Sequence, residues 1–258
     1  MKILVCVKQI SDTDDIVRID ASRAWIEYHE KTSFRMNRYD EYALEEALRI
    51  REKYPETSID AISLGPARAV STIRKALEMG ADNGIHLLAE QNSFISPSEI
   101  ATLIATVAKP KGYSLILAGV MAEDDMFCQT GQLVAAMLGL PCATSVIYQE
   151  RFENGKTLYV EREIEGGQRE CLHIDLPAVL TIQSGINRPR YPSLSNVLRA
   201  RKQEILRLNI KDLRQPEPCE CLACLSYPQT QLKGEFIQGS LENKARTLLR
   251  VLHQKALL

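Results

Sequence analysis

Apolar runs of strand length recur along the first half of the chain, each followed by a segment in which apolar residues repeat every three or four positions. The runs cover residues 2–7, 59–64, 85–88 and 114–118, and their continuous apolar character is typical of strands buried on both faces. The helical segments cover 41–54, 67–79, a stretch beginning at Pro97, and 130–138. This alternation predicts a mainly parallel sheet with flanking helices.

Local signals mark where several of these helices begin and end. Asp40 precedes the first helical segment and is its expected N-cap. Ser96, Pro97 and Glu99 have the spacing of a capping box with proline at the first helical position. Gly80 and Gly139 follow the second and fourth helical segments, where glycine commonly ends a helix.

The pattern changes after Pro141. Segments 142–149 and 157–164 flank Asn154-Gly155, a strong hairpin signal, and an extended stretch at 172–182 follows Gly166-Gly167. From Asn187 the chain is polar and basic without clear periodicity, and only 241–257 is predicted to be helical again. The predicted fold class is therefore α/β, a mainly parallel sheet with flanking helices, added antiparallel strands and an extended C-terminal arm. The predicted domains are 1–186 and 187–258, the second lying on a partner.

Charge and composition exclude several classes. The 258 residues carry 32 Lys and Arg against 33 Asp and Glu, a formal charge of −1, so no basic field favours nucleic acid. The longest uncharged stretch, 126–149, is interrupted by polar residues, glycine and proline, so no membrane span is expected. The short apolar run at the N-terminus does not fit a signal peptide. With seven cysteines, an odd number, we expect a soluble cytoplasmic protein in a reducing compartment.

Candidate chemistry gathers where predicted strands end. Neither of the two standard glycine-rich phosphate loops occurs. Segment 119–131 follows the strand at 114–118, and Gln129-Thr130-Gly131 opens a helix whose amides and hydroxyl could hold an anion. The strand ends at Lys8 and Leu64 reach the same sheet edge, where open parallel sheets bind ligands. The alternative is a capped crossover loop with solvated acids.

An ordered set of motifs over residues 1–205 resembles a known family. The motifs are Lys2-Ile-Leu-Val-Cys-Val-Lys8, Met36-Asn37 before Glu41-Tyr-Ala-Leu-Glu-Glu-Ala47, Gly65-Pro66-Ala67, Ala76-Leu-Glu-Met-Gly-Ala-Asp82, Gln129-Thr-Gly-Gln132, Val160-Glu-Arg-Glu-Ile164 and Asn187-Arg-Pro-Arg-Tyr191. Together they resemble the beta subunits of electron transfer flavoproteins. Each motif alone is weak, whereas their order is specific.

The resemblance implies a Rossmann-like nucleotide-binding domain and an electron carrier subunit rather than an enzyme. It implies a heterodimer whose alpha subunit holds most of a redox-active FAD, while the beta subunit holds a structural AMP. Gln129 and Thr130 would face the phosphate, and backbone groups of Cys6 and Leu64 the nucleoside. The full set of implied cofactor-binding residues is Cys6, Asn37, Arg38, Tyr39, Asp40, Leu64, Gly119, Val120, Met121, Ala122, Glu123, Asp124, Asp125, Met126, Phe127, Cys128, Gln129 and Thr130.

The chain departs from the family pattern at Cys128, where the family usually has Asn, and at Met126-Phe127. A thiol is a weaker hydrogen-bonding group than an amide. A second FAD in place of AMP, as in the electron-bifurcating relatives, therefore stays open. An alternative of another class is an ATP-binding enzyme or sensor on a related fold. Such an enzyme would need a glycine-rich loop after the first strand to bind pyrophosphate. This chain has Lys8-Gln-Ile-Ser-Asp12 there, without glycine.

Segment 190–199 matches the loop by which members of the family recognise an acyl-CoA or related dehydrogenase. Leu194 would be the apolar anchor. The other implied partner-binding residues are Arg190, Tyr191, Asn196 and Arg199, the arginines steering an acidic surface. The alternative is an ordinary basic connection with one incidental leucine.

Cys219, Cys221 and Cys224 lie outside the family pattern. Three cysteines within six residues could hold zinc with a fourth ligand, or part of an iron–sulfur cluster. No fourth ligand is identified in the sequence, so a cysteine-rich linker is the favoured interpretation and no metal site is predicted.

Overall fold

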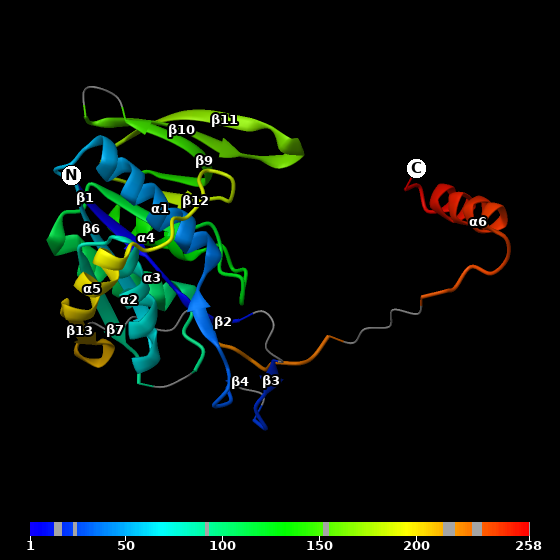
Figure 1. Cartoon of the computed structure of the whole chain (residues 1–258), viewed down its shortest axis with the longest axis horizontal. Helices are drawn as coiled ribbons and strands as arrows, with labels where there is room; N and C mark the ends of the chain where they lie inside the picture. The colour runs from blue at the N-terminus through cyan, green and yellow to red at the C-terminus, as the bar shows by residue number, and fades with distance from the viewer. Residues whose placement is uncertain are drawn as a thin grey trace. The chain divides into compact units, whose positions relative to one another are not determined.

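The computed structural model describes residues 1–12, 17–22, 25–90, 93–151, 155–213, 220–228 and 234–257. They belong to two compact units, Met1–Leu225 and Ser226–Leu258. The first unit is built on one large sheet, and the second contains one helix (Figure 1). Asn154 of the predicted hairpin turn and Cys219 lie outside the described residues.

The sheet has nine strands in the order β11-β10-β9-β12-β8-β1-β6-β7-β13 (Figure 1). Every pair from β9 to β13 along this order is parallel, while β9, β10 and β11 pair antiparallel. The predicted α/β fold, mainly parallel with antiparallel additions, is confirmed. The strands are β1 (Lys2–Cys6), β6 (Ser58–Gly65), β7 (Asn83–Leu88), β8 (Leu115–Gly119), β9 (Cys142–Arg151), β10 (Thr157–Glu163), β11 (Arg169–Asp175), β12 (Ala178–Ile182) and β13 (Ile205–Asn209).

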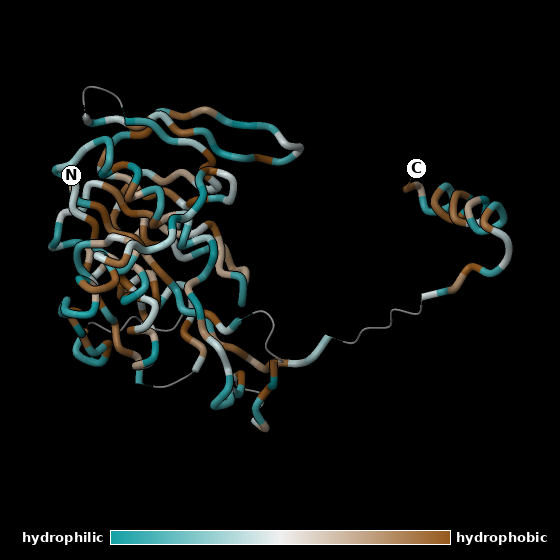
Figure 2. Tube along the Cα trace, in the orientation of Figure 1, coloured by the Kyte–Doolittle hydropathy of each residue, from teal (hydrophilic) through white to brown (hydrophobic). Residues whose placement is uncertain are grey.

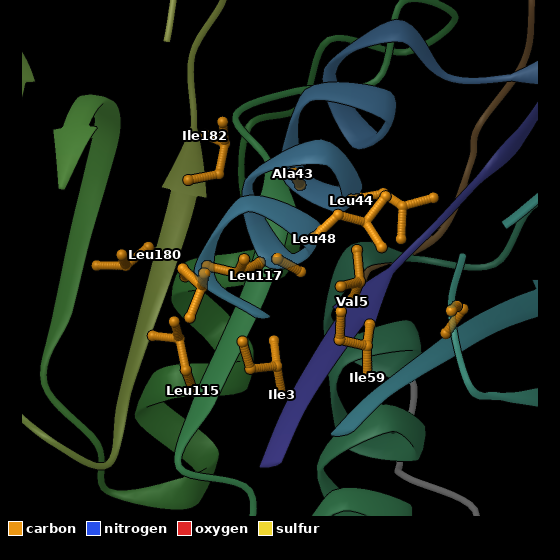
Figure 3. Close-up of a cluster of buried hydrophobic side chains, with 14 of the residues drawn as sticks. Ile3, Val5, Ala43, Leu44, Leu48, Ile59, Leu115, Leu117, Leu180 and Ile182 are labelled. Atoms are coloured by element: carbon orange, nitrogen blue, oxygen red, sulfur yellow. The ribbon is translucent and has the colours of Figure 1, made fainter. Parts of the chain in front are cut away.

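Helices cover both faces of the sheet because its strands are apolar on both faces. The helices α1 (Arg38–Lys53), α2 (Val70–Met79) and α5 (Leu194–Lys202) share one buried cluster with the strands, and α3 (Pro97–Ala108) and α4 (Thr130–Leu138) share the other. Figure 3 shows Leu44 and Leu48 of α1 packed over Val5 of β1 and Leu117 of β8. The hydropathy trace has its most apolar segments inside this unit (Figure 2).

The capping signals are confirmed at α3 but not at α1. The Ser96 hydroxyl accepts a hydrogen bond from the Glu99 amide at 3.2 Å, and the Glu99 carboxylate accepts one from the Ser96 amide at 3.0 Å. The prediction that Asp40 caps α1 is wrong, because the helix begins at Arg38 with Asn37 at its N-cap. Asp40 lies in the first turn of α1, and its carboxylate accepts hydrogen bonds from backbone amides at the ends of two strands.

The described residues between β1 and α1 contain four short strands. β2 (Gln9–Ser11) pairs antiparallel with β5 (Phe34–Met36), and β3 (Arg18–Ile19) with β4 (Ile26–Glu27). Strands of two or three residues are too short to give a readable alternation of apolar and polar positions, which is why the sequence did not predict them.

The absence of secondary structure expected after Asn187 is also wrong. Ser193 caps α5 by accepting a hydrogen bond from the Asn196 amide, and Ala200 is the one buried residue of this helix. β13 adds a parallel strand beside β7 (Figure 1). Arg74 of α2 donates to the carbonyls of Ala200 and Gln203. Residues 187–213 therefore belong to the first unit. That the segment from 187 lies on a partner stays a prediction.

The second unit contains α6 (Leu241–Gln254), which confirms the helix predicted near the C-terminus. Ser240 caps it by accepting a hydrogen bond from the Asn243 amide at 3.3 Å. No residue of α6 is buried within its unit, and Leu241, Leu248 and Leu249 are exposed. In the described part of the chain no helix is both long and apolar enough to cross a membrane.

Candidate functional site

A cavity opens where β1, β6 and β8 end at their carboxyl sides and where α3 and α4 begin. It measures about 760 Å³ when the open space at its mouth is included. In a parallel sheet this edge is where ligands bind, since strand ends and helix starts converge there.

The cavity brings together most of the residues predicted to bind a cofactor. Those that line it are Cys6, Asn37, Asp40, Leu64, Gly119, Val120, Met121, Ala122, Asp125, Phe127, Cys128, Gln129 and Thr130. The predicted residues that do not line it are Arg38, Tyr39, Glu123, Asp124 and Met126. Several of these hold the lining residues in place, as the hydrogen bonds below show.

Sequence reasoning missed one wall of the cavity. Pro97, Ile100 and Ile104 of α3 form this wall, and Ile62 of β6 also lines the cavity. The three α3 residues repeat at three- and four-residue spacing and so resemble an ordinary core stripe. The signal available in the sequence was the capping box at Ser96, because it marks the start of the helix that follows the strand at 85–88. An apolar wall beside polar strand ends suits the flat face of a base or another planar ring.

Asp40 joins two strand ends beneath the cavity. Its carboxylate accepts hydrogen bonds from the Lys8 amide at 2.8 Å and the Gly119 amide at 2.9 Å. A β-carbon at Gly119 would lie 2.5 Å from the Asp40 Oδ1 atom, so only glycine allows this approach. Burial raises the pKa of the Asp40 carboxyl from 3.8 to about 7, although the two amide donors oppose the shift.

Asn37 fixes the loop after β8. Its Nδ2 donates to the Met121 carbonyl at 2.9 Å, and its Oδ1 accepts from the Glu123 amide at 3.1 Å. The Glu123 carboxylate in turn accepts from the Arg38 amide at 3.0 Å and from the Arg35 guanidinium at 2.9 Å. Burial raises the pKa of Glu123, but these donors more than offset it and hold the pKa below its usual value. Arg38 and Glu123 thus shape the loop from outside the cavity.

The start of α4 presents backbone amides to the cavity. Gln129 is the N-cap residue, and its side chain does not cap the helix. A β-carbon at Gly131 would lie 2.4 Å from Thr181 Cγ2 of β12, so glycine lets the helix start lie close against the sheet. Amides at a helix start, next to the Thr130 hydroxyl, favour an anionic group.

The loop that leads into α4 has two residues in the left-handed region. Met126 has a φ of 54° and Cys128 a φ of 56°. Residues other than glycine and asparagine adopt this conformation at a cost of about 1–3 kcal/mol. This conformation favours asparagine, the residue that the resembled family usually has at position 128, whereas this chain has cysteine there.

Besides Asp40, two groups at the cavity have shifted pKa values. Burial raises the pKa of the Cys6 thiol to about 12, so this thiol stays protonated. Burial lowers the pKa of Lys8, but the carboxylates of Asp124 and Asp125 more than offset this and raise it above its usual value. The Lys8 ammonium lies 2.7 Å from Asp124 Oδ1 and 2.6 Å from Asp125 Oδ2, and it remains charged.

The segment predicted to recognise a dehydrogenase divides into anchored and exposed residues. The Arg190 guanidinium pairs with Glu45 at 2.8 Å and Glu52 at 2.5 Å. Arg199 donates to the Leu77 carbonyl at 3.0 Å and the Ala81 carbonyl at 3.3 Å, at the end of α2. Tyr191 and Leu194 are instead 96% and 76% exposed. The amide of Asn196, another predicted contact, donates to the Ser193 cap.

Two of the three clustered cysteines belong to the described residues. Cys221 and Cys224 are exposed free thiols, and Cys219 lies outside the described residues. Across the residues that the structure describes, no group of three His, Cys, Asp or Glu side chains is arranged to hold a metal ion.

Comparison with known proteins agrees with this architecture. The electron transfer flavoprotein domain family matches residues 26–213. The mitochondrial electron transfer flavoprotein subunit beta of Arabidopsis thaliana is 41% identical over 216 residues, covering 83% of this chain and 84% of the relative. The electron transfer flavoprotein subunits beta of Bradyrhizobium diazoefficiens and Homo sapiens are each 38% identical, covering 82% and 80% of this chain and 83% and 80% of the relative. The chain belongs to the electron transfer flavoprotein family, and the relatives it resembles are beta subunits.

Proposed function

We propose that this chain is the beta subunit of a heterodimeric electron carrier, that it holds AMP in the cavity at the ends of β1, β6 and β8, and that it completes the FAD site of an alpha subunit. The observation that carries the proposal is that one cavity is lined both by the start of α4 and by Asp40, whose carboxylate binds the amides at two strand ends. The AMP has a structural role, because it supplies charge and packing rather than redox chemistry.

The cavity fits a nucleoside monophosphate by the chemistry of its walls. The α4 amides and the Thr130 hydroxyl suit the phosphate. Ile100 and Ile104 suit the flat face of a base, and backbone groups near Cys6 and Leu64 can read its edge. Gly119 and Gly131 let the backbone approach closely, since a side chain at either position would collide with a neighbour.

A partner subunit is supported by the second unit. All described residues of α6 are at least partly exposed within that unit, although the helix carries several leucines. An amphipathic helix of this kind is stable when its apolar face is covered. We propose that the alpha subunit covers it, and that FAD in the alpha subunit carries the electrons.

For dehydrogenase docking, the exposed pair Tyr191 and Leu194 is the proposed contact surface. Tyr191 precedes α5 and Leu194 is its first residue, and the Ser193 cap fixes the start of this helix. The proposed partner is an acyl-CoA or related dehydrogenase. Arg190 and Arg199, predicted from sequence to steer the partner, are assigned here to holding the segment in place, because carboxylates and carbonyls of this chain already bind their guanidinium groups.

The test is the nucleotide and flavin content of the purified heterodimer. One FAD and one AMP per heterodimer is the expected result. Two FAD and no AMP would replace the proposal by the bifurcating type, and bound ATP without FAD would favour an ATP-binding enzyme or sensor.

Two variants of Thr130 locate the phosphate. Thr130→Ala removes one hydroxyl and should weaken AMP retention modestly. Thr130→Pro removes a backbone donor and disturbs the helix start, so it should abolish retention. Equal AMP content in the proline variant and the parent protein would place the phosphate elsewhere.

A further inference from the structure

We propose that the bridge of Lys8, Asp124 and Asp125 makes the cavity selective for a nucleoside monophosphate and against diphosphates and triphosphates. The inference rests on the proposed function and adds the residues that set the length of the phosphate chain.

The charges at the cavity are unusual for a site that accepts a polyphosphate. Among the described residues that line it, Lys8 is the one lysine or arginine, while Asp40 and Asp125 are acidic. Sites for di- and triphosphates commonly combine Lys or Arg with a metal ion to balance the charge. Here the donors at the α4 start are neutral amides and a hydroxyl, which suit a single phosphate.

Lys8 is already committed to two carboxylates. Its ammonium lies 2.7 Å from Asp124 Oδ1 and 2.6 Å from Asp125 Oδ2. The bridge as a whole therefore carries a net negative charge. A terminal phosphate that extended toward it would meet two carboxylates and one cation that they already share, and like charges at short range repel.

The bridge is held close to the phosphate end by the chain itself. Asp125 lies four residues before Gln129 at the start of α4. Its Oδ1 accepts a hydrogen bond from the Phe127 amide at 3.2 Å, and the Met126 amide donates to the Ala122 carbonyl at 2.9 Å. These turns keep the loop compact, so Asp125 cannot swing away freely from a longer ligand.

Neutral side chains of the same shape test the inference. Asp124→Asn with Asp125→Asn removes both negative charges and keeps oxygen acceptors for the Phe127 amide and Lys8. The matched control is Glu163→Gln with Glu165→Gln, which removes the same charge at the end of β10, away from the cavity lining. Lys8→Met, which leaves the carboxylates without their cation, should act in the opposite direction.

The measurement is equilibrium dialysis of the nucleotide-depleted heterodimer against AMP, ADP, and ADP with magnesium. The parent protein should prefer AMP over ADP by about tenfold or more, the size of one like-charge contact at a partly exposed site. The asparagine double variant should lose most of this preference, chiefly through a gain in ADP affinity. Lys8→Met should increase the preference, and the glutamine control should leave it unchanged.

Several results would overturn the inference. Equal affinity of the parent for AMP and ADP would do so, as would an unchanged preference in the double variant. Magnesium-ADP binding as tightly as AMP would mean that the carboxylates recruit a metal ion instead of repelling phosphate. If the double variant does not fold, the single change Asp125→Asn and the parent's own AMP-to-ADP ratio decide. Failure of both nucleotides to bind the parent would refute the proposed function itself, and this inference with it.

Discussion

Replacing Arg190 separates a structural role from a docking role for the segment before α5. The Arg190 Nε and Nη2 atoms each lie 2.8 Å from a carboxylate oxygen of Glu45, and its backbone amide donates to the same carboxylate at 3.1 Å. Glu45 is 4% exposed on α1, so Arg190→Ala would leave a buried carboxylate without its cation.

The expected cost of Arg190→Ala follows from this burial. Removing one partner of a buried ion pair costs about 3–5 kcal/mol, and the lower end applies because the Arg190 side chain is 36% exposed. A loss of about 3 kcal/mol lowers the melting temperature of a protein of this size by about 6–12 °C. Arg190→Lys should recover part of the loss, because an ammonium cannot form both parallel hydrogen bonds.

The assay is thermal and urea unfolding of the heterodimer, with dehydrogenase affinity measured on the same samples. Arg188→Ala is the matched control, since Arg188 is an exposed cation two residues earlier in the same segment. We expect Arg190→Ala to destabilise the protein strongly and the control to change little. If instead both variants unfold like the parent and Arg190→Ala weakens dehydrogenase binding alone, Arg190 contacts the partner directly and the structural reasoning fails.

Three further predictions concern other parts of the chain. Leu194→Ala should weaken dehydrogenase binding by about 1–3 kcal/mol in a binding titration, the value of one buried leucine, and leave the unfolding temperature unchanged. If it dissociates the heterodimer instead, the segment is a subunit contact. Cys128→Asn should stabilise the loop before α4 by about 1 kcal/mol and slow AMP release, because asparagine tolerates the left-handed φ of 56°, whereas Cys128→Ala should bring no gain. Asp40 adds a pH dependence to stability: its folded pKa is raised from 3.8 to about 7, so the folded state binds more protons across that window and stability falls as the pH rises through it. The advantage of the parent over Asp40→Asn in unfolding free energy should therefore shrink with rising pH across the window, and an advantage that grows would contradict the assigned shift.

The sequence alone determined the central sheet and the helices that flank it. Buried parallel strands are continuous apolar runs, and the capping box at Ser96 and the glycines at 80 and 139 mark helix ends through local backbone chemistry. The edge of the sheet that carries the cavity also followed, because strand direction fixes where the carboxyl ends lie.

Tertiary structure alone decided the roles of single residues within those elements. Asp40 looked like a helix cap, yet its carboxylate binds the amides of Lys8 and Gly119 from two distant strands. Arg190 and Arg199 looked like exposed cations, yet α1 and α2 supply their partners. Local patterns report the geometry of neighbouring residues in the chain, whereas hydrogen bonds and ion pairs depend on which segments the fold brings together. For the same reason the sequence did not predict β13, because its partner strand β7 lies more than a hundred residues earlier in the chain.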